Sequence, residues 1–218
     1  MSVVDKITQS PLSEDQYFKE VHPKSQIYLH HTAGNSNPYN VVKDWQTDSR
    51  GRIATCVVIG GEGYDGEIVQ TFTSKYWAYH LGVKSSVFAN YGLPHTTLDK
   101  TSIGIEICSW GQLTEKDGKY YNYVNREVPP SQVCTLDTPF KGYKHFHKYT
   151  NAQIQAVKEL LLYWKDLYKI PIEYKEDIWQ VTKRALSNQP GLFTHNSVRA
   201  DKVDVFPQPD LIQMLKSL

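Results

Sequence analysis

The alternation of hydrophobic and polar residues predicts several short strands. Residues 27–30 form an apolar run that leads into a turn-rich stretch, and residues 102–108 (SIGIEIC) follow a strict period of two. Residues 54–59 and 67–72 are two further strand-like runs, separated by GGEGYDG, which favours a hairpin or a tight loop. These segments predict a β-sheet.

Helical periodicity is clearest over residues 150–168. Ile154, Val157, Leu161 and Trp164 share one face there, and Thr150 or Asn151 is suited to cap the start. Shorter helices are predicted over residues 13–20, 39–48, 176–187 and 210–218. Strands interleaved with helices predict an α/β fold, a single domain with a central mixed β-sheet flanked by helices.

The polar residues 1–24 are interpreted as an N-terminal extension, and residues 25–218 as the domain itself. Between about residues 110 and 149 the pattern is lost, and this stretch is predicted to be an irregular, aromatic-rich insertion. Only KDGKYYNYV within it, residues 116–124, suggests a small hairpin.

Composition excludes several classes of function. Hydrophobic residues make up 40% of the 218 residues, which is enough for a core, and 24 basic against 23 acidic residues create no strong field for nucleic acid. Three scattered cysteines favour neither a disulfide framework nor a multi-cysteine zinc site. The 15 Tyr and 5 Trp are suited either to stack on sugar rings or to fill a core.

The first residues, MSVVDKITQS, lack a basic segment followed by an apolar one, and no apolar run reaches membrane-spanning length. We therefore expect a protein that is made in the cytoplasm without a signal peptide and does not insert into a membrane.

Two separated segments suggest a zinc site. His30 stands at the end of a predicted strand, on the face opposite Ile27 and Leu29, where its ring can reach a cleft. His195 and Asp204 come from one late loop, and with a distant histidine they provide three zinc ligands and leave a fourth position for water. Each segment alone also fits a hydrogen-bonded histidine or a solvated charged loop.

Glu106 is the third unusual residue, because it stands within the apolar strand SIGIEIC. A carboxylate there is unfavourable unless it is paired or faces a wet cleft, and a cleft position raises its pKa and suits it to general-base catalysis. The alternative is an edge-strand glutamate that faces solvent.

IYLHHTAG, SIGIEI and the late spacing of His195, Lys202 and Asp204 occur in an order that resembles the type-2 N-acetylmuramoyl-L-alanine amidase family. That family includes amidase-type phage lysozymes and peptidoglycan recognition proteins. WAYHLGV resembles its Trp-His-Gly segment, and YTNAQIQAVKELLLYW its long late helix. The resemblance covers residues 26–218.

The resemblance implies a role for each matching position. His30, His195 and Asp204 match the zinc ligands, Glu106 the water-activating base and Lys202 the residue that stabilises the oxyanion. Trp77, His80 and Thr32 are expected to contact the substrate, and His31 to be structural. Many members carry a tyrosine on the second strand that reaches toward the zinc-bound water. We place Val57 at that position in this chain, so Glu106 is expected to serve instead of the tyrosine.

The implied function is zinc-dependent hydrolysis of the amide between N-acetylmuramic acid and L-alanine in peptidoglycan, by a lytic, endolysin-like enzyme that acts on the cell wall. Two alternatives remain open: an intracellular amidase that recycles muropeptides, and a non-catalytic peptidoglycan-binding receptor. The expected partner is peptidoglycan or a muropeptide, and the expected oligomeric state is a monomer.

Overall fold

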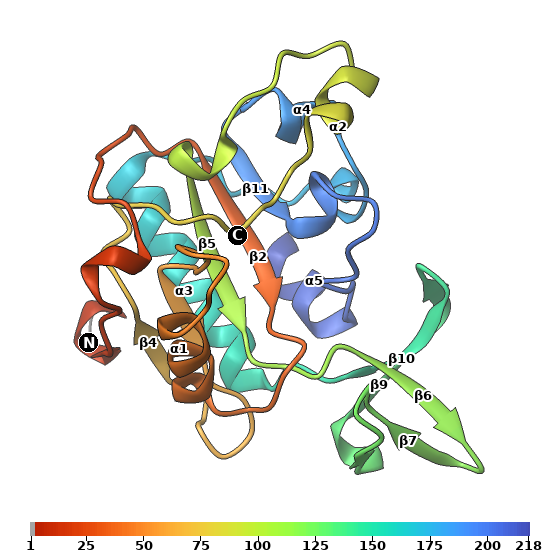
Figure 1. The fold of residues 1–218 in the computed structure, drawn as a ribbon. Coiled ribbons are helices and arrows are strands. Elements are labelled where there is room, and N and C mark those ends of the chain that lie inside the picture. The colour runs from red at the N-terminus through yellow and green to blue at the C-terminus, as the bar shows by residue number, and fades with distance from the viewer. Residues whose placement is uncertain (1–2) are drawn as a thin grey trace.

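A six-stranded mixed sheet forms the centre of the molecule in the computed structural model, which describes residues 3–218 (Figure 1). Strands β11, β2, β5 and β3 are parallel to one another, and β4 pairs antiparallel with β3. In spatial order the strands are β1 (Ile7–Gln9), β4 (Ile68–Gln70), β3 (Val57–Ile59), β5 (Ser102–Ile107), β2 (Gln26–His31) and β11 (Gly191–Thr194).

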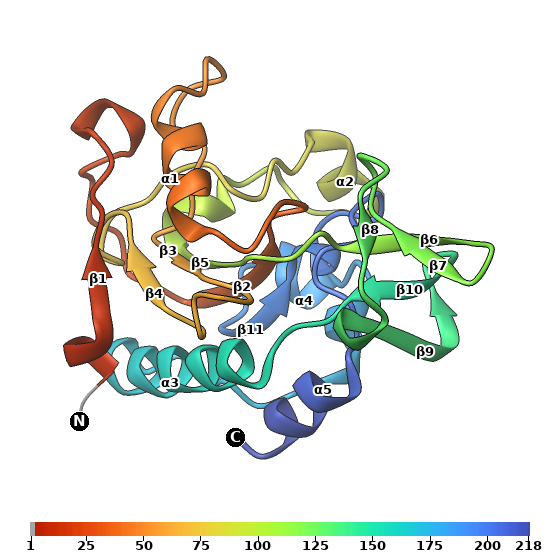
Figure 2. The same cartoon turned by 90° about the horizontal axis from the view of Figure 1, so that it is seen from below.

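Helices lie on both faces of this sheet. The long helix α3 (Asn151–Tyr168) runs along one face, and α1 (Pro38–Gln46) lies on the opposite side (Figure 2). Strand β2 is buried along its whole length, as expected for a strand in the middle of a covered sheet. The predicted α/β fold with a mixed central sheet is therefore confirmed.

The start of α3 follows directly from its sequence. The Thr150 hydroxyl accepts a hydrogen bond from the Gln153 amide at 3.1 Å, and the Gln153 side chain accepts one from the Thr150 amide at 3.0 Å. This reciprocal arrangement satisfies two backbone donors that a helix start leaves free. The predicted helix and its Thr150 cap are both confirmed.

The segment of residues 110–149 is a five-stranded antiparallel sheet that projects from the body (Figure 1). The hairpin of β6 and β7 was predicted, and its turn uses Asp117 and Gly118, both at positive φ. The prediction of an irregular remainder is wrong. Pro139 argues against a strand in the sequence, because proline cannot donate a backbone hydrogen bond. It nevertheless lies in β9, which is an edge strand and therefore tolerates proline. In spatial order these strands are β8 (Glu127–Val128), β7 (Lys119–Tyr121), β6 (Gln112–Lys116), β10 (Tyr143–His147) and β9 (Val133–Phe140). We call this segment the ribbon.

Two predicted helices differ from the structure. Residues 13–20 contain only the single turn Glu14–Gln16, because Phe18 instead forms a backbone bridge with Trp77. The predicted helix over residues 176–187 is divided in two, because the Thr182 hydroxyl accepts a hydrogen bond from the Arg184 amide and starts a new helix. Its parts are the 3-10 turn Glu176–Trp179 and α4 (Lys183–Leu186).

The remaining helical segments are short. They are α2 (Ser85–Asn90), α5 (Pro209–Lys216) and the 3-10 turns Val3–Lys6, Leu98–Thr101, Pro130–Gln132 and His195–Ser197. Within residues 3–218 there is no helix with the length and apolar character needed to traverse a bilayer. Near the N-terminus, β1 pairs with β4 and thereby extends the central sheet.

His147 joins the ribbon to the body. Its Nδ1 accepts a hydrogen bond from the Trp110 amide at 3.3 Å, and its backbone carbonyl accepts one from the Ser109 hydroxyl at 3.0 Å. Burial and the neighbouring His31 lower the pKa of His147 to about 4. The ring is therefore neutral in the folded protein at pH values at which an exposed histidine, with a pKa near 6.5, is protonated.

We expect acid to destabilise the fold through His147. Between about pH 6.5 and pH 4 the unfolded chain binds this proton more tightly, so stability is intact above that window and falls as the pH drops through it. Urea unfolding of metal-free protein at pH 7 and pH 5 measures the loss. His147→Gln should lose about 2 kcal/mol less than the wild type, whereas the same change at the exposed His95 should behave like the wild type. Equal losses in wild type and His147→Gln would contradict this role.

Candidate metal centre

Three neighbouring parallel strands bring polar side chains to one level of the sheet. His30 of β2 lies in register with Glu106 of β5, and Thr194 at the end of β11 lies in register with Leu29. His195 follows Thr194 directly and continues the same row. Residues in register on parallel strands point to the same face, so these three side chains gather on the side of the sheet where α1 lies.

Three ligand atoms converge at this point. The Nδ1 atoms of His30 and His195 are 3.1 Å apart, and the Oδ2 atom of Asp204 lies 2.9 Å from His195 Nδ1 and 3.4 Å from His30 Nδ1. All three residues are buried, and their ligand atoms lie within 4.8 Å of one another. Two imidazoles and one carboxylate form the kind of three-ligand set that zinc uses when a fourth position is left open.

The hydrogen bond behind His195 indicates which of its ring nitrogens faces Asp204. His195 Nε2 lies 2.9 Å from the Leu81 carbonyl, which only accepts, so Nε2 carries a proton. In the neutral ring Nδ1 then presents a lone pair to a carboxylate oxygen of Asp204. A proton or a metal ion between these two atoms removes the repulsion between their lone pairs. A metal ion bound by His30, His195 and Asp204 satisfies all three ligand atoms.

The charge states suit a metal as well. Burial and the neighbouring His195 lower the pKa of His30 to about 4, so its ring is neutral at pH 7. Burial opposes ionisation of Asp204, but the interactions with His195 and His30 outweigh it and hold the pKa well below its usual value. A neutral imidazole, as in His30, and an ionised carboxylate, as in Asp204, are the forms that coordinate metals.

Of these three residues, Asp204 lies on an irregular loop, and packing holds that loop in place. The Asn196 side chain donates to the Val205 carbonyl at 2.7 Å, and Phe206 stacks on Phe146 of the ribbon with ring centroids 4.3 Å apart. Lys141 of the ribbon donates to the Ala200 carbonyl at 3.1 Å. The ribbon therefore braces the loop that carries Asp204.

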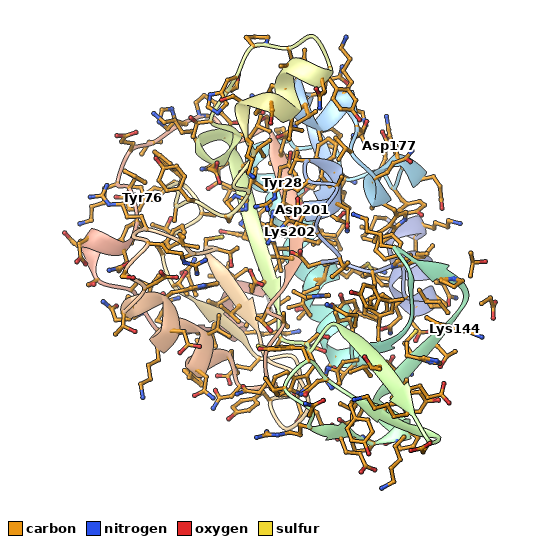
Figure 3. The ribbon with its side chains drawn as sticks, turned by 45° about the vertical axis from the view of Figure 1, so that its right-hand side comes forward. Tyr28, Tyr76, Lys144, Asp177, Asp201 and Lys202 are labelled. Atoms are coloured by element: carbon orange, nitrogen blue, oxygen red, sulfur yellow. The ribbon has the colours of Figure 1, made fainter. Side chains whose placement is uncertain are left out.

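The metal cluster lies in a cleft with a volume of about 320 Å³. We call it the metal cleft, and its lining includes His30, Thr32, Thr55, His80, Glu106, His195, Lys202 and Asp204. Figure 3 shows Lys202 and Asp201 in front of the central strands, and both residues line the metal cleft. The structure thus brings together the histidines, the carboxylates and the lysine that were selected from separate parts of the sequence.

Glu106 lies on a central strand, between β3 and β2, which excludes the edge-strand alternative. Glu106 is half-buried and lines the metal cleft. Burial, reinforced by the charge of Asp204, raises its pKa well above the usual value, and Lys202 acts in the opposite direction. A carboxyl group in this environment is suited to proton transfer near neutral pH.

The residues expected to contact substrate have different surroundings. Thr32 lines the metal cleft. Trp77 does not, because it is 3% exposed and its ring stacks on Phe18 with centroids 3.9 Å apart. His80 lines the metal cleft, but both its ring nitrogens are engaged, Nδ1 with His30 Nε2 at 2.9 Å and Nε2 with the Ser102 hydroxyl at 2.8 Å.

The strand register shows that Val57 was wrongly placed at the position of the family's tyrosine. Val57 pairs with Ile105 and therefore lies on the face opposite Glu106, which pairs with Val58. From this run Thr55 reaches the metal cleft, and its hydroxyl donates to the Val57 carbonyl at 2.8 Å. No tyrosine side chain enters the cleft from this strand. Residues that the sequence did not single out include Thr55 and Ser102.

Comparison with known proteins gives a family match and several similar folds. A family model described as N-acetylmuramoyl-L-alanine amidase matches residues 20–207. The structure of PlyL superposes with a TM-score of 0.54 at 15% identity over 96% of each chain. The amidase LysC from Clostridium intestinale URNW gives 0.51 at 14% identity, over 97% of this chain and 95% of its own. AmiD from E. coli, solved with the substrate anhydro-N-acetylmuramic acid-L-Ala-D-gamma-Glu-L-Lys, gives 0.51 at 20% identity over 90% and 59%. A search of curated protein sequences found no match.

We expect one zinc ion to bind per chain. Asp204→Ala should weaken zinc binding by more than the roughly 10- to 100-fold that is typical for residues that only hydrogen-bond to metal ligands. The reason is that the variant leaves only two ligands. Competition with a chromophoric chelator measures the affinity. Asp201→Asn is the matched control, because Asp201 is 66% exposed and pairs with Arg199 instead. Wild-type affinity in Asp204→Ala would rule out Asp204 as a ligand.

Proposed function

Since the chain belongs to the N-acetylmuramoyl-L-alanine amidase family, we propose that it is a zinc-dependent hydrolase of peptidoglycan that cleaves the amide between N-acetylmuramic acid and L-alanine. The observation that carries the proposal is the convergence of His30, His195 and Asp204 in a cleft that also contains Glu106 and Lys202. These side chains provide a metal site, a base and a positive charge around one small volume.

His30, His195 and Asp204 hold the zinc ion in this proposal. When bound, zinc supplies Lewis-acid activation of water and of the scissile carbonyl. The two histidines coordinate through Nδ1, because their Nε2 atoms are engaged on the far side of each ring. The buried cluster excludes bulk water from its protein side, which strengthens electrostatic interactions at the reacting atoms.

Glu106 acts as the proton carrier. It takes a proton from the attacking water as the new C–O bond forms, and it delivers that proton to the alanine nitrogen as the C–N bond breaks. The products are a carboxylate on the muramic acid and a free amino group on the peptide. The Lys202 ammonium group stabilises the negative charge that develops on the carbonyl oxygen.

We favour a lytic role over muropeptide recycling. A second groove continues from the metal cleft past Glu106 to the ribbon, which suits a long substrate better than a small fragment. The receptor alternative is less favoured because all three ligand positions hold residues that coordinate zinc. We propose that the enzyme acts on the cell wall as a monomer.

Digestion of purified sacculi tests this function. The wild type should release alanine amino groups without new reducing ends, and a chelator should abolish this release. Glu106→Gln should keep its zinc but react slower by about 100-fold or more, because it no longer accepts a proton. Glu127→Gln, which changes an exposed glutamate on the ribbon, is the matched control and should be fully active.

New reducing ends in place of amino groups would indicate glycosidase activity and refute the proposal. Full activity of Glu106→Gln would refute the role of that residue alone. Soluble anhydro-muropeptides serve as the second substrate, and a strong preference for them over sacculi would replace the lytic role with recycling.

A further inference from the structure

A second groove, with a volume of about 390 Å³, lies beside the metal cleft. The two share Thr32, Ala33, Trp45 and Glu106 in their linings, so they form one continuous surface. We call the second groove the aromatic compartment, and its characteristic residues are Trp45, Trp110, Tyr123, Asn35, Asn40 and Asp44. Trp45 comes from α1, whereas Trp110 and Tyr123 come from residues 110–149.

The Asn122 side chain stabilises the backbone turn that carries Tyr123. The Asn122 side chain accepts hydrogen bonds from the Val124 amide at 3.2 Å and the Arg126 amide at 2.9 Å. Tyr123 is nevertheless 62% exposed, and its ring contacts Trp110 at a centroid distance of 6.0 Å. A large aromatic side chain that stays exposed on an ordered turn beside a groove is typical of a binding surface.

We propose that the aromatic compartment binds the saccharide units next to the cleaved muramic acid, a step that rests on the proposed function. Aromatic rings pack against the apolar faces of sugars, and the amides of Asn35 and Asn40 are suited to bond to hydroxyl and acetamido groups. The stem peptide is the other possible occupant, but its carboxylates would meet Asp44. Asp48 and Arg50 also line the compartment and are paired with each other, which leaves Asp44 outside that pair.

Substrates that carry the same tripeptide on one or on four sugars test this site. The wild type should show a higher kcat/KM for the tetrasaccharide, and Tyr123→Ala should lose about 10-fold on it, a stacking contribution, but less than 2-fold on the monosaccharide. Tyr143→Ala, which removes another exposed ribbon tyrosine outside the compartment, is the control. An equal loss on both substrates, or a dependence on peptide length rather than on sugar number, would overturn the proposal.

Binding of chitotetraose, followed by tryptophan fluorescence, separates this proposal from the proposed function. Binding to the wild type and about 10-fold weaker binding to Tyr123→Ala support the site even if the protein cleaves no amide. Binding that is unaffected by Tyr123→Ala overturns it even if the amidase activity is present.

A separate observation concerns the outer side of the metal centre. Two consecutive residues bind the Nε2 atoms of the two histidines. The His80 ring is the partner of His30, and the Leu81 carbonyl is the partner of His195. The backbone amides of both residues donate to the same oxygen, Asp99 Oδ1, at 2.8 and 2.9 Å. Asp99 is 6% exposed. One buried carboxylate therefore fixes the segment that orients both rings.

The hydrogen bonds behind His30 run in one direction. If His30 coordinates through Nδ1, its Nε2 donates to His80 Nδ1, and His80 Nε2 donates to the Ser102 hydroxyl at 2.8 Å. That hydroxyl donates to the Asp99 carbonyl at 3.4 Å. Gly104 leaves room for the His80 ring, because a Cβ atom there would lie 3.1 Å from His80 Nδ1.

We infer that Asp99 and His80 are positioning residues that select Nδ1 of both histidines for the metal. Groups that hold metal-ligating histidines usually change the metal affinity by about 10- to 100-fold when they are removed. The inference explains why His80 faces the metal cleft with no ring nitrogen free for substrate.

Zinc affinity, measured by chelator competition, and the visible spectrum of the Co²⁺ form test the inference. His80→Phe and Asp99→Ala should each weaken zinc binding by about 10-fold or more and change the Co²⁺ spectrum. Asp99→Asn keeps an oxygen for the two amides and should retain most of the affinity. His95→Phe removes an exposed histidine that packs on Phe88 and is the control.

Unfolding of the metal-free variants shows whether they are folded. If His80→Phe does not fold, the milder variant Ser102→Ala is measured in its place. A zinc affinity of Ser102→Ala several-fold below that of the wild type supports the inference. Unchanged affinity and an unchanged spectrum in a folded His80→Phe or Ser102→Ala protein would overturn it. Failure of Asp99→Asn to rescue Asp99→Ala would overturn the role of Asp99 as an acceptor.

Discussion

Burial of three ionisable side chains at one level of a parallel sheet is the constraint on which the site depends. His30, His195 and Asp204 lose their contact with water, which is unfavourable unless each finds a partner of suitable charge. Within the protein they offer one another mainly lone pairs, so a cation at their centre is the natural counterpart. The outer hydrogen bonds to His80 and Leu81 fix the rings so that those lone pairs point inward.

The ribbon contributes to this centre although it supplies none of the three ligands. Asp204 is the proposed ligand that no strand holds, and its loop is packed by the stacking of Phe206 against Phe146 and bonded by Lys141. The ribbon also presents Tyr123 at the groove that continues from the metal cleft. One inserted sheet thus links the geometry of the metal site to the shape of the substrate surface, because both rest on the same five strands.

The sequence predicted the parts of the fold that local patterns determine. The capping box of Thr150 and the alternation of SIGIEIC are local signals, and both elements formed as expected. Tertiary partners decided the remainder. Phe18 pairs with Trp77, which buries a tryptophan that was expected in the cleft, and β9 and β10 obtain their partners only within the ribbon. His80 and Glu106 were both placed near the cleft, but the direction in which the His80 ring is bonded depends on Ser102 and Asp99, which no pattern indicated.

Glu106 shows why register matters more than residue type in the metal cleft. The neighbouring strand offers Val58 beside it and Thr55 further along, and the Thr55 hydroxyl is already bonded to a backbone carbonyl. Among the other carboxylates of the cleft, Asp204 holds the histidines and Asp201 pairs with Arg199. Glu106 takes part in neither of these pairs and is half-buried on the wall of the cleft. Burial and the charge of Asp204 raise its pKa, whereas Lys202 opposes that rise. A carboxyl group with a raised pKa beside the proposed metal site is the kind of group that accepts and releases a proton in general acid–base catalysis.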